Sequence, residues 1–220
     1  MSAVKAPILL GVLVSGSGTN LQAIIDAIAA GRLDATIAVV VSNVATAGGL
    51  ARAEKASIPA VVVDHKAYAS RAQFDAAVVE ELRAHGVDWV VLAGFMRIVT
   101  ATLLDAYPHR VVNVHPALLP AFPGVNGQAQ ALAYGVRVTG CTVHLVDAGT
   151  DTGAILAQAV VPVLDEDDEH TLAARILVEE HALLPAVLQW IAEGRVTVEP
   201  REGARPRVRV PGTKTTRGLL

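Results

Sequence analysis

The chain has 220 residues, a formal net charge of −3, 52% hydrophobic residues and 18% charged residues. This composition excludes a disordered chain and predicts a sizeable core in one large domain or two small ones. The small negative charge argues against a general nucleic-acid binder. A single cysteine, Cys141, excludes an intrachain disulfide and a multi-cysteine zinc site, and it suits a reducing cytoplasm.

The first apolar run, residues 8–14, is too short to span a membrane, and glycines at 16 and 18 follow it closely. A signal peptide would need a more basic start and a cleavage site of small residues. The run therefore predicts a buried strand in a soluble protein that has no membrane partner.

The first half of the chain alternates between short Val- and Ile-rich runs and helical patterns. The runs lack polar alternation, as strands buried on both faces do; they are 8–14, 35–41, 60–63, 89–93 and 111–115. Ser70 followed by Gln73 predicts the start of a helix over 70–85, and Thr19 followed by Gln22 repeats that signal. This order predicts an α/β fold, a mostly parallel twisted sheet with helices on both faces.

The pattern changes near residue 138. Residues 138–146 and 154–163 predict two adjacent strands, an antiparallel addition to the sheet, joined by the acidic loop 147–153. A long helix is expected over about 170–193, bent at Pro185 and ended by Gly194. We expect one domain over 1–200 and a mobile basic tail over 201–220, which has six basic residues and one acidic residue.

The glycine-containing turn at 15–21 is the first candidate site. Backbone amides at such a turn, at a helix N-terminus, favour a phosphate. The spacing matches neither a P-loop nor G-x-G-x-x-G, because Leu21 stands at the sixth position. One phosphate monoester is the better hypothesis, and a plain tight turn is the alternative.

Asn113 and His115 form the second candidate site. They lie two residues apart on a predicted strand, so they share a face at its carboxyl end, where open α/β sheets hold ligands. Together they could hydrogen-bond a carbonyl oxygen as it gains charge. A purely structural histidine at a strand end remains the alternative.

His144 and Asp151 form the third candidate site. His144 lies on an otherwise apolar strand, and a buried, satisfied histidine is the alternative reading. Asp151 lies in a glycine-containing loop, where an aspartate is usually a turn residue. Near an imidazole it could hold that imidazole protonated or accept a proton through water. No spacing in the chain suggests a metal site, and no residue stands out as a covalent nucleophile.

These segments together resemble the glycinamide ribonucleotide formyltransferase family of purine synthesis, over about residues 1–197. The resemblance rests on SGSGTNLQAII at the start, VVLAGFMRI at 90–98, NVHPALLPAFPG at 113–124, GCTVHLV at 140–146, and Asp151 with the glycine that follows it. It implies a single-domain, Rossmann-like formyltransferase fold.

The resemblance also implies a set of site residues. The catalytic residues would be Asn113, His115 and Asp151, with His144 in support. The substrate phosphate and ribose would be bound by Gly18, Thr19, Asn20, Pro116 and Glu180. The folate would be bound by Arg71, Met96, Arg97, Ile98, Val99, Asn113, Asp147 and Asp151. The chain departs from the family at Gln128, near which many relatives carry a histidine, and at Thr19, where serine is common.

The implied reaction is formyl transfer from 10-formyltetrahydrofolate, as co-substrate, to the primary amine of glycinamide ribonucleotide. The implied enzyme is cytoplasmic, needs no metal, binds no nucleic acid, and is a monomer or a homodimer.

Four alternatives remain. A formyltetrahydrofolate hydrolase would bring an N-terminal regulatory domain, whereas the first strand here starts near residue 7. A methionyl-tRNA formyltransferase would bring a C-terminal RNA-binding domain, whereas only a short tail follows residue 200. A non-catalytic folate or nucleotide sensor would not need all three polar residues. A Rossmann oxidoreductase would need a third glycine and an acid after the second strand, where Ser42 and Asn43 stand.

Overall fold

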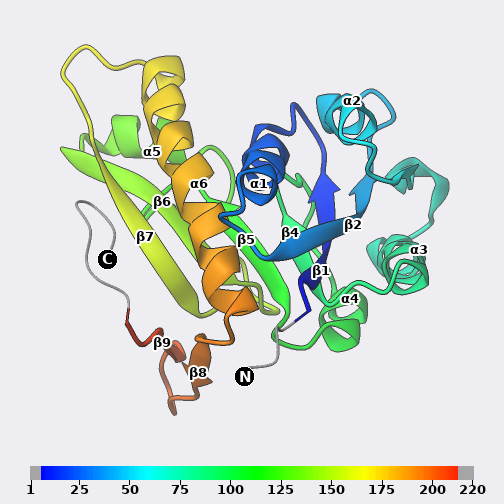
Figure 1. The fold of residues 1–220 in the computed structure, drawn as a ribbon. Coiled ribbons are helices and arrows are strands. Elements are labelled where there is room, and N and C mark those ends of the chain that lie inside the picture. The colour runs from blue at the N-terminus through cyan, green and yellow to red at the C-terminus, as the bar shows by residue number, and fades with distance from the viewer. Residues whose placement is uncertain (1–5, 213–220) are drawn as a thin grey trace.

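The computed structural model describes residues 6–212 and contains a seven-stranded sheet in the order β3-β2-β1-β4-β5-β6-β7 (Figure 1). The first five strands pair in parallel, and β6 and β7 extend the sheet antiparallel to their neighbours. The strands are β1 (Ile8–Val14), β2 (Ala35–Ser42), β3 (Ala60–Val62), β4 (Trp89–Leu92), β5 (Val111–His115), β6 (Val138–Leu145) and β7 (Ile155–Pro162). The predicted fold class is confirmed.

Helices cover both faces of the sheet. One hydrophobic cluster packs α1 and α6 against it, and the second packs α3 and α4 against the opposite face of β1, β2 and β4. Figure 1 shows α1 and α6 side by side. The helices are α1 (Thr19–Ala29), α2 (Gly48–Lys55), α3 (Arg71–Ala84), α4 (Ala101–Ala106), α5 (Gly127–Tyr134) and α6 (Glu169–Ala192), with a 3-10 turn at His65–Ala67.

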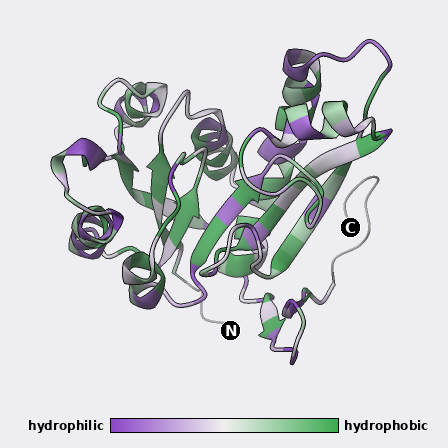
Figure 2. Ribbon diagram, turned by 180° about the vertical axis from the view of Figure 1, so that it is seen from behind, coloured by the Kyte–Doolittle hydropathy of each residue, from purple (hydrophilic) through white to green (hydrophobic). Residues whose placement is uncertain are grey.

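The strands of the sheet are apolar along most of their length, as Figure 2 shows by their green colour. Leu10, Val12 and Val14 face the first cluster, whereas Leu13 faces the second, so β1 is buried on both sides. This explains why the central strands show no polar alternation in sequence.

The first residues of α3 and α1 can be compared with the two helix starts predicted from the sequence. The Ser70 hydroxyl accepts a hydrogen bond from the Gln73 amide, 3.2 Å away, as predicted for α3. The signal at Thr19 correctly predicts a helix that begins there, but Thr19 is the first helical residue and not the cap, because Gly18 is the N-cap of α1 and no side chain caps the helix. Gly18 has a φ of 71°, and a Cβ there would lie 2.5 Å from the Cα of Gly49. The close packing of α1 and α2 therefore leaves no room for a capping side chain.

The chain after α6 contains a short antiparallel pair, β8 (Thr197–Glu199) with β9 (Arg207–Arg209). The expected tail thus contributes a strand, and its remainder from 213 lies outside the described residues. Over residues 6–212, no helix is both long enough and apolar enough to cross a bilayer.

Candidate active site

The pairing of β5 with β6 brings the candidate side chains together. Asn113 lies opposite His144, and His115 lies opposite Thr142, so all four share one face. The alternate residues, Val112 and Val114 among them, pack into the cluster beneath α6. At these two strands, the face away from α6 is therefore the one that carries the polar side chains.

The Asp151 carboxylate lies between the two histidines. Its Oδ2 is 3.5 Å from Nδ1 of His115, and its Oδ1 is 3.5 Å from Nε2 of His144. The amide of Gly124 donates to the same Oδ2 at 2.7 Å. His115 and His144 are buried, and 12% of the Asp151 side chain is exposed. The predicted Asn113, His115, His144 and Asp151 thus form one cluster.

Hydrogen bonds to backbone carbonyls define the outer nitrogen of each imidazole. The Nε2 of His115 lies 2.8 Å from the carbonyl oxygen of Phe122, and the Nδ1 of His144 lies 3.0 Å from that of Leu145. A carbonyl only accepts, so each of these nitrogens carries a proton. The inner nitrogens, Nδ1 of His115 and Nε2 of His144, therefore face Asp151.

Asn113 completes the cluster. Its Nδ2 lies 3.1 Å from Nε2 of His144. This contact holds the Asn113 side chain against the His144 ring and leaves the rest of its amide group for another partner. His144 is therefore a support for Asn113.

Burial and charge act in opposite directions on the pKa values here. Burial lowers the pKa of His115 below its ordinary 6.5, although the Phe122 carbonyl and the Asp151 carboxylate oppose the shift. Burial alone would raise the pKa of Asp151, but hydrogen bonds from His144 and Gly124 and the nearby imidazoles hold it below its ordinary value. The cluster therefore places a carboxylate that favours its ionised form beside an imidazole whose burial disfavours the protonated form.

Thr142 holds the loop that follows β5 through two hydrogen bonds. Its hydroxyl donates to the carbonyl of Ala117 at 2.7 Å and accepts from the amide of Leu119 at 3.0 Å. Gln158 on β7 donates to the same hydroxyl and to the Leu119 carbonyl. This network holds the loop that supplies Phe122 and Gly124 to the cluster.

The turn after β1 presents the first amides of α1. A helix N-terminus leaves these N–H groups without intrahelical acceptors, and no side chain caps them at Gly18. Arg52 on α2 donates through Nε to the Ser17 carbonyl at 2.8 Å, which places a guanidinium beside the turn. Thr19 and Arg52 also line a pocket of about 360 Å³. This arrangement suits an anion.

Asn20 and Glu180 connect this turn to α6. The Nδ2 of Asn20 donates to Oε2 of Glu180 at 2.8 Å, and both residues are buried. Desolvation raises the pKa of Glu180 to about 7, although the bond from Asn20 opposes the shift. The Oδ1 of Asn20 is buried and has no hydrogen-bond partner in the described structure. A polar group with hydroxyls or amides would satisfy it.

The loop after β4 is held at both ends. The Met96 amide donates to the Ser15 hydroxyl at 2.8 Å, and that hydroxyl donates to Oδ1 of Asn43 at 2.6 Å. At the other end, the amide and hydroxyl of Thr100 both donate to the buried Asp75. Ser15 thus ties the ends of β1, β2 and β4 together.

This loop presents apolar side chains to solvent. Met96 is 78% exposed and Ile98 is 59% exposed, whereas Val99 is buried. The Arg97 guanidinium lies over the Phe74 ring, 5.1 Å from its centroid. The loop therefore exposes a small apolar surface next to the ends of β1 and β4.

The remaining predicted residues lie around this centre. Pro116 directly follows His115, and Arg71 is the exposed first residue of α3. The Asp147 carboxylate accepts from the Gly149 amide and the Thr152 hydroxyl, so it shapes the loop that carries Asp151. Gln128 is half-buried on α5.

Several residues of the site were not predicted from sequence. They act through backbone groups or from distant elements, and they are Asn43, Arg52, Phe122, Gly124, Thr142 and Gln158. Within residues 6–212, no three His, Cys, Asp or Glu side chains are grouped to hold a metal. Burial raises the pKa of the Cys141 thiol to about 12, so this buried cysteine is unreactive.

Comparison with known proteins points to one family. The family described as Formyl transferase matches residues 10–188. The phosphoribosylglycinamide formyltransferase of Mycobacterium tuberculosis (strain ATCC 25618 / H37Rv) is 48% identical over 203 residues, which cover 92% of this chain and 94% of that protein. The crystal structure of glycinamide ribonucleotide transformylase 1 from Symbiobacterium toebii is 51% identical, with a TM-score of 0.90, and covers 96% of this chain and 97% of that one.

One longer relative contains a segment that is similar to this chain. The trifunctional purine biosynthetic protein adenosine-3 of Drosophila melanogaster is 46% identical over 193 residues, or 87% of this chain. The chain spans only 14% of the length of that relative. The similarity to it therefore concerns one segment of a larger protein.

Glu180 gives a prediction about stability and pH. Its pKa is about 7 in the folded protein against an ordinary 4.5, so the folded state binds an extra proton between these values. Stability therefore falls as pH rises through this range, and the full cost is present above pH 7. Glu180→Gln should raise the free energy of unfolding at pH 8 by about 3 kcal/mol, at about 1.4 kcal/mol per pKa unit.

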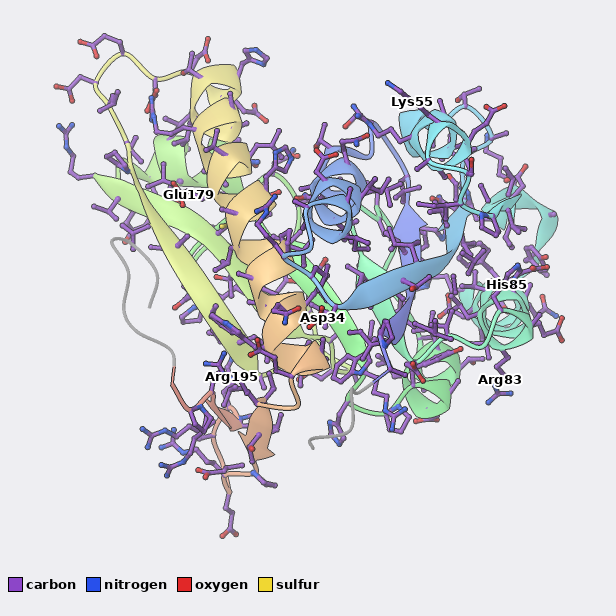
Figure 3. The ribbon with its side chains drawn as sticks, in the orientation of Figure 1. Asp34, Lys55, Arg83, His85, Glu179 and Arg195 are labelled. Carbon is purple, nitrogen blue, oxygen red and sulfur yellow. The ribbon has the colours of Figure 1, made fainter. Side chains whose placement is uncertain are left out.

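The measurement is urea unfolding of the ligand-free protein at pH 8 and at pH 4.5, where the gain should vanish. Glu179→Gln is the matched control, because Glu179 is the half-exposed preceding residue of α6 (Figure 3). An equal gain for Glu180→Gln at both pH values would contradict the raised pKa of Glu180.

Proposed function

The chain belongs to the formyl transferase family, and on that premise we propose that it formylates the primary amine of glycinamide ribonucleotide with 10-formyltetrahydrofolate. The reaction would serve de novo purine synthesis. The single observation that supports it best is the cluster of Asn113, His115 and Asp151 at the end of β5.

In the proposed mechanism, the amine nitrogen attacks the formyl carbon, and the carbonyl oxygen becomes negatively charged. Asn113 and protonated His115 donate to this oxyanion. The imidazole is a weak base in the free protein, because burial lowers the pKa of His115. The developing negative charge and the Asp151 carboxylate favour its protonated form. Each oxyanion donor of this kind lowers the barrier by about 3 kcal/mol.

Asp151 is proposed to move the proton. The bond between the formyl carbon and N10 of the folate breaks, and the amine must lose a proton as N10 gains one. Asp151 remains anionic because its pKa is held low, so it can accept the amine proton through a water molecule and return it to N10. No metal takes part in these steps.

The substrates are proposed to bind on either side of this centre. The phosphate would lie at Gly18, Thr19 and Asn20, with the ribose at Glu180 and Pro116 next to His115. The folate would lie against Arg71 and the loop of Met96, Arg97, Ile98 and Val99, with its pteridine near the backbone of 147–151. The exposed Met96 and Ile98 suit that ligand, because part of its surface is apolar.

We further propose that the protein acts in the cytoplasm on small molecules alone, as a monomer or a homodimer.

One acceptor experiment tests the central proposal. The protein is incubated with 10-formyltetrahydrofolate, and folate release is followed with and without glycinamide ribonucleotide. The expected result is release that depends on the amine, with formylated product in equal amount. Release at the same rate without the amine would contradict the proposal and indicate a hydrolase.

Asp151→Asn should lower kcat about 100-fold or more, because it removes the proton carrier. It also removes the negative charge that raises the pKa of His115. The decline of kcat/KM toward high pH, where His115 loses its proton, should therefore begin at a lower pH than in the wild type. The measurement is a pH profile of formyl transfer. Asp105→Asn, at an exposed position on α4, is the control for the loss of one charge; near-normal turnover of Asp151→Asn would contradict the assignment.

A further inference from the structure

The hairpin of β8 and β9 forms a separate two-stranded sheet, which packs against the main part of the protein. Val198 and Val208 pack against the cluster beneath α6, and β9 contacts β7. Arg195, which follows α6 and is labelled in Figure 3, donates to the Pro211 carbonyl through Nε at 2.9 Å and Nη2 at 2.7 Å. The bonds from Arg195 to Pro211 thus join the two ends of the hairpin at its base, and the two valines hold the hairpin against the core.

The turn between the two strands carries Arg205, whose side chain reaches the loop between β6 and β7. Its Nη2 donates to the backbone carbonyl of Asp151 at 2.7 Å. Arg205 itself is half-buried. A hydrogen bond from a guanidinium is stronger than one between neutral groups, so this contact can restrain the residue that receives it.

Asp151 needs such a restraint. Its φ is 55°, in the left-handed region that non-glycine residues rarely adopt. The strained backbone conformation directs its carboxylate toward His115 and His144, and it persists only when surrounding contacts determine it. The Gly124 amide donates to the Asp151 carboxylate, and Arg205 donates to the Asp151 backbone carbonyl. Both the side chain and the backbone of Asp151 are therefore restrained.

The position of Arg205 also argues against a role in stability alone. Its Nη1 is buried and has no hydrogen-bond partner in the described structure. A buried, unsatisfied N–H on a charged group is costly, whereas an apolar side chain of similar length would carry no such cost. The guanidinium is therefore better explained by the bond that it makes to Asp151.

We propose that Arg205 is a positioning residue, which holds the Asp151 carboxylate between the two histidines through the Asp151 backbone. The proposal rests on the proposed function of Asp151. Arg205 lies beyond residue 188, the end of the matched family segment. The proposal therefore gives a part in the reaction to the segment 201–220, which the sequence predicts to be a mobile tail.

The test compares Arg205→Met, which keeps the aliphatic stem and removes the donors, with Arg207→Met, an exposed arginine on the same hairpin. Arg205→Met should lower kcat roughly tenfold to a hundredfold, with KM for glycinamide ribonucleotide changed less than about threefold. The Tm values of the two variants should agree within about 2 °C. Arg205→Lys, which keeps a charged donor, should recover part of kcat.

The mechanism of the effect is tested in the Asp151→Asn background. If Arg205 acts through the Asp151 carboxylate, adding Arg205→Met to Asp151→Asn should cause no further loss of kcat. An equal loss in both backgrounds, or wild-type kcat in folded Arg205→Met and Arg205→Lys, would overturn the proposal. Near-normal turnover of Asp151→Asn alone would instead overturn the proposed function of Asp151, so the two failures are distinguishable.

Discussion

The Asp151 carboxylate lies between two buried imidazoles, 3.5 Å from Nδ1 of His115 and 3.5 Å from Nε2 of His144. A carboxylate that is 12% exposed would tend to take up a proton, yet hydrogen bonds from His144 and Gly124 hold its pKa low. The loop after β5 must therefore close over the sheet to supply the Gly124 amide. The loop after β6 must bend back through a left-handed residue to supply Asp151 itself. The fold's loops, rather than its helices, complete this face of the sheet.

Much of the fold could be predicted because the buried strands are continuous apolar runs. The strand predicted at 8–14 matches β1, and that at 111–115 matches β5. The helices α2 and α5 were not predicted, since each has eight residues, a glycine at its start and no side-chain cap. The β8–β9 pair was not predicted either, because each strand has three residues in a basic segment and depends on its contacts with the core.

The candidate site also contains residues that could be predicted from the sequence and residues that could not. Strand spacing alone places Asn113 and His115 on one face, and the structure agrees. Asp151 could be named only by resemblance, because its position depends on loop closure and a left-handed backbone. The groups that orient the histidines, the carbonyls of Phe122 and Leu145, are backbone atoms and leave no residue-specific signal in sequence. The capping box at Thr19 does not form, because Gly18 is the N-cap of α1 and its close packing against Gly49 excludes a side chain at position 18.

The most direct measurement is the protonation of His115 in solution, followed by nitrogen NMR of the imidazole and assigned with His115→Gln. The account predicts a proton on Nε2 in the neutral ring, because that nitrogen donates to Phe122. It also predicts a titration midpoint below 6.5 in the wild type that falls further in Asp151→Asn. A proton on Nδ1 in the neutral ring, or a midpoint that Asp151→Asn leaves unchanged, would contradict the central place given to the Asp151 carboxylate.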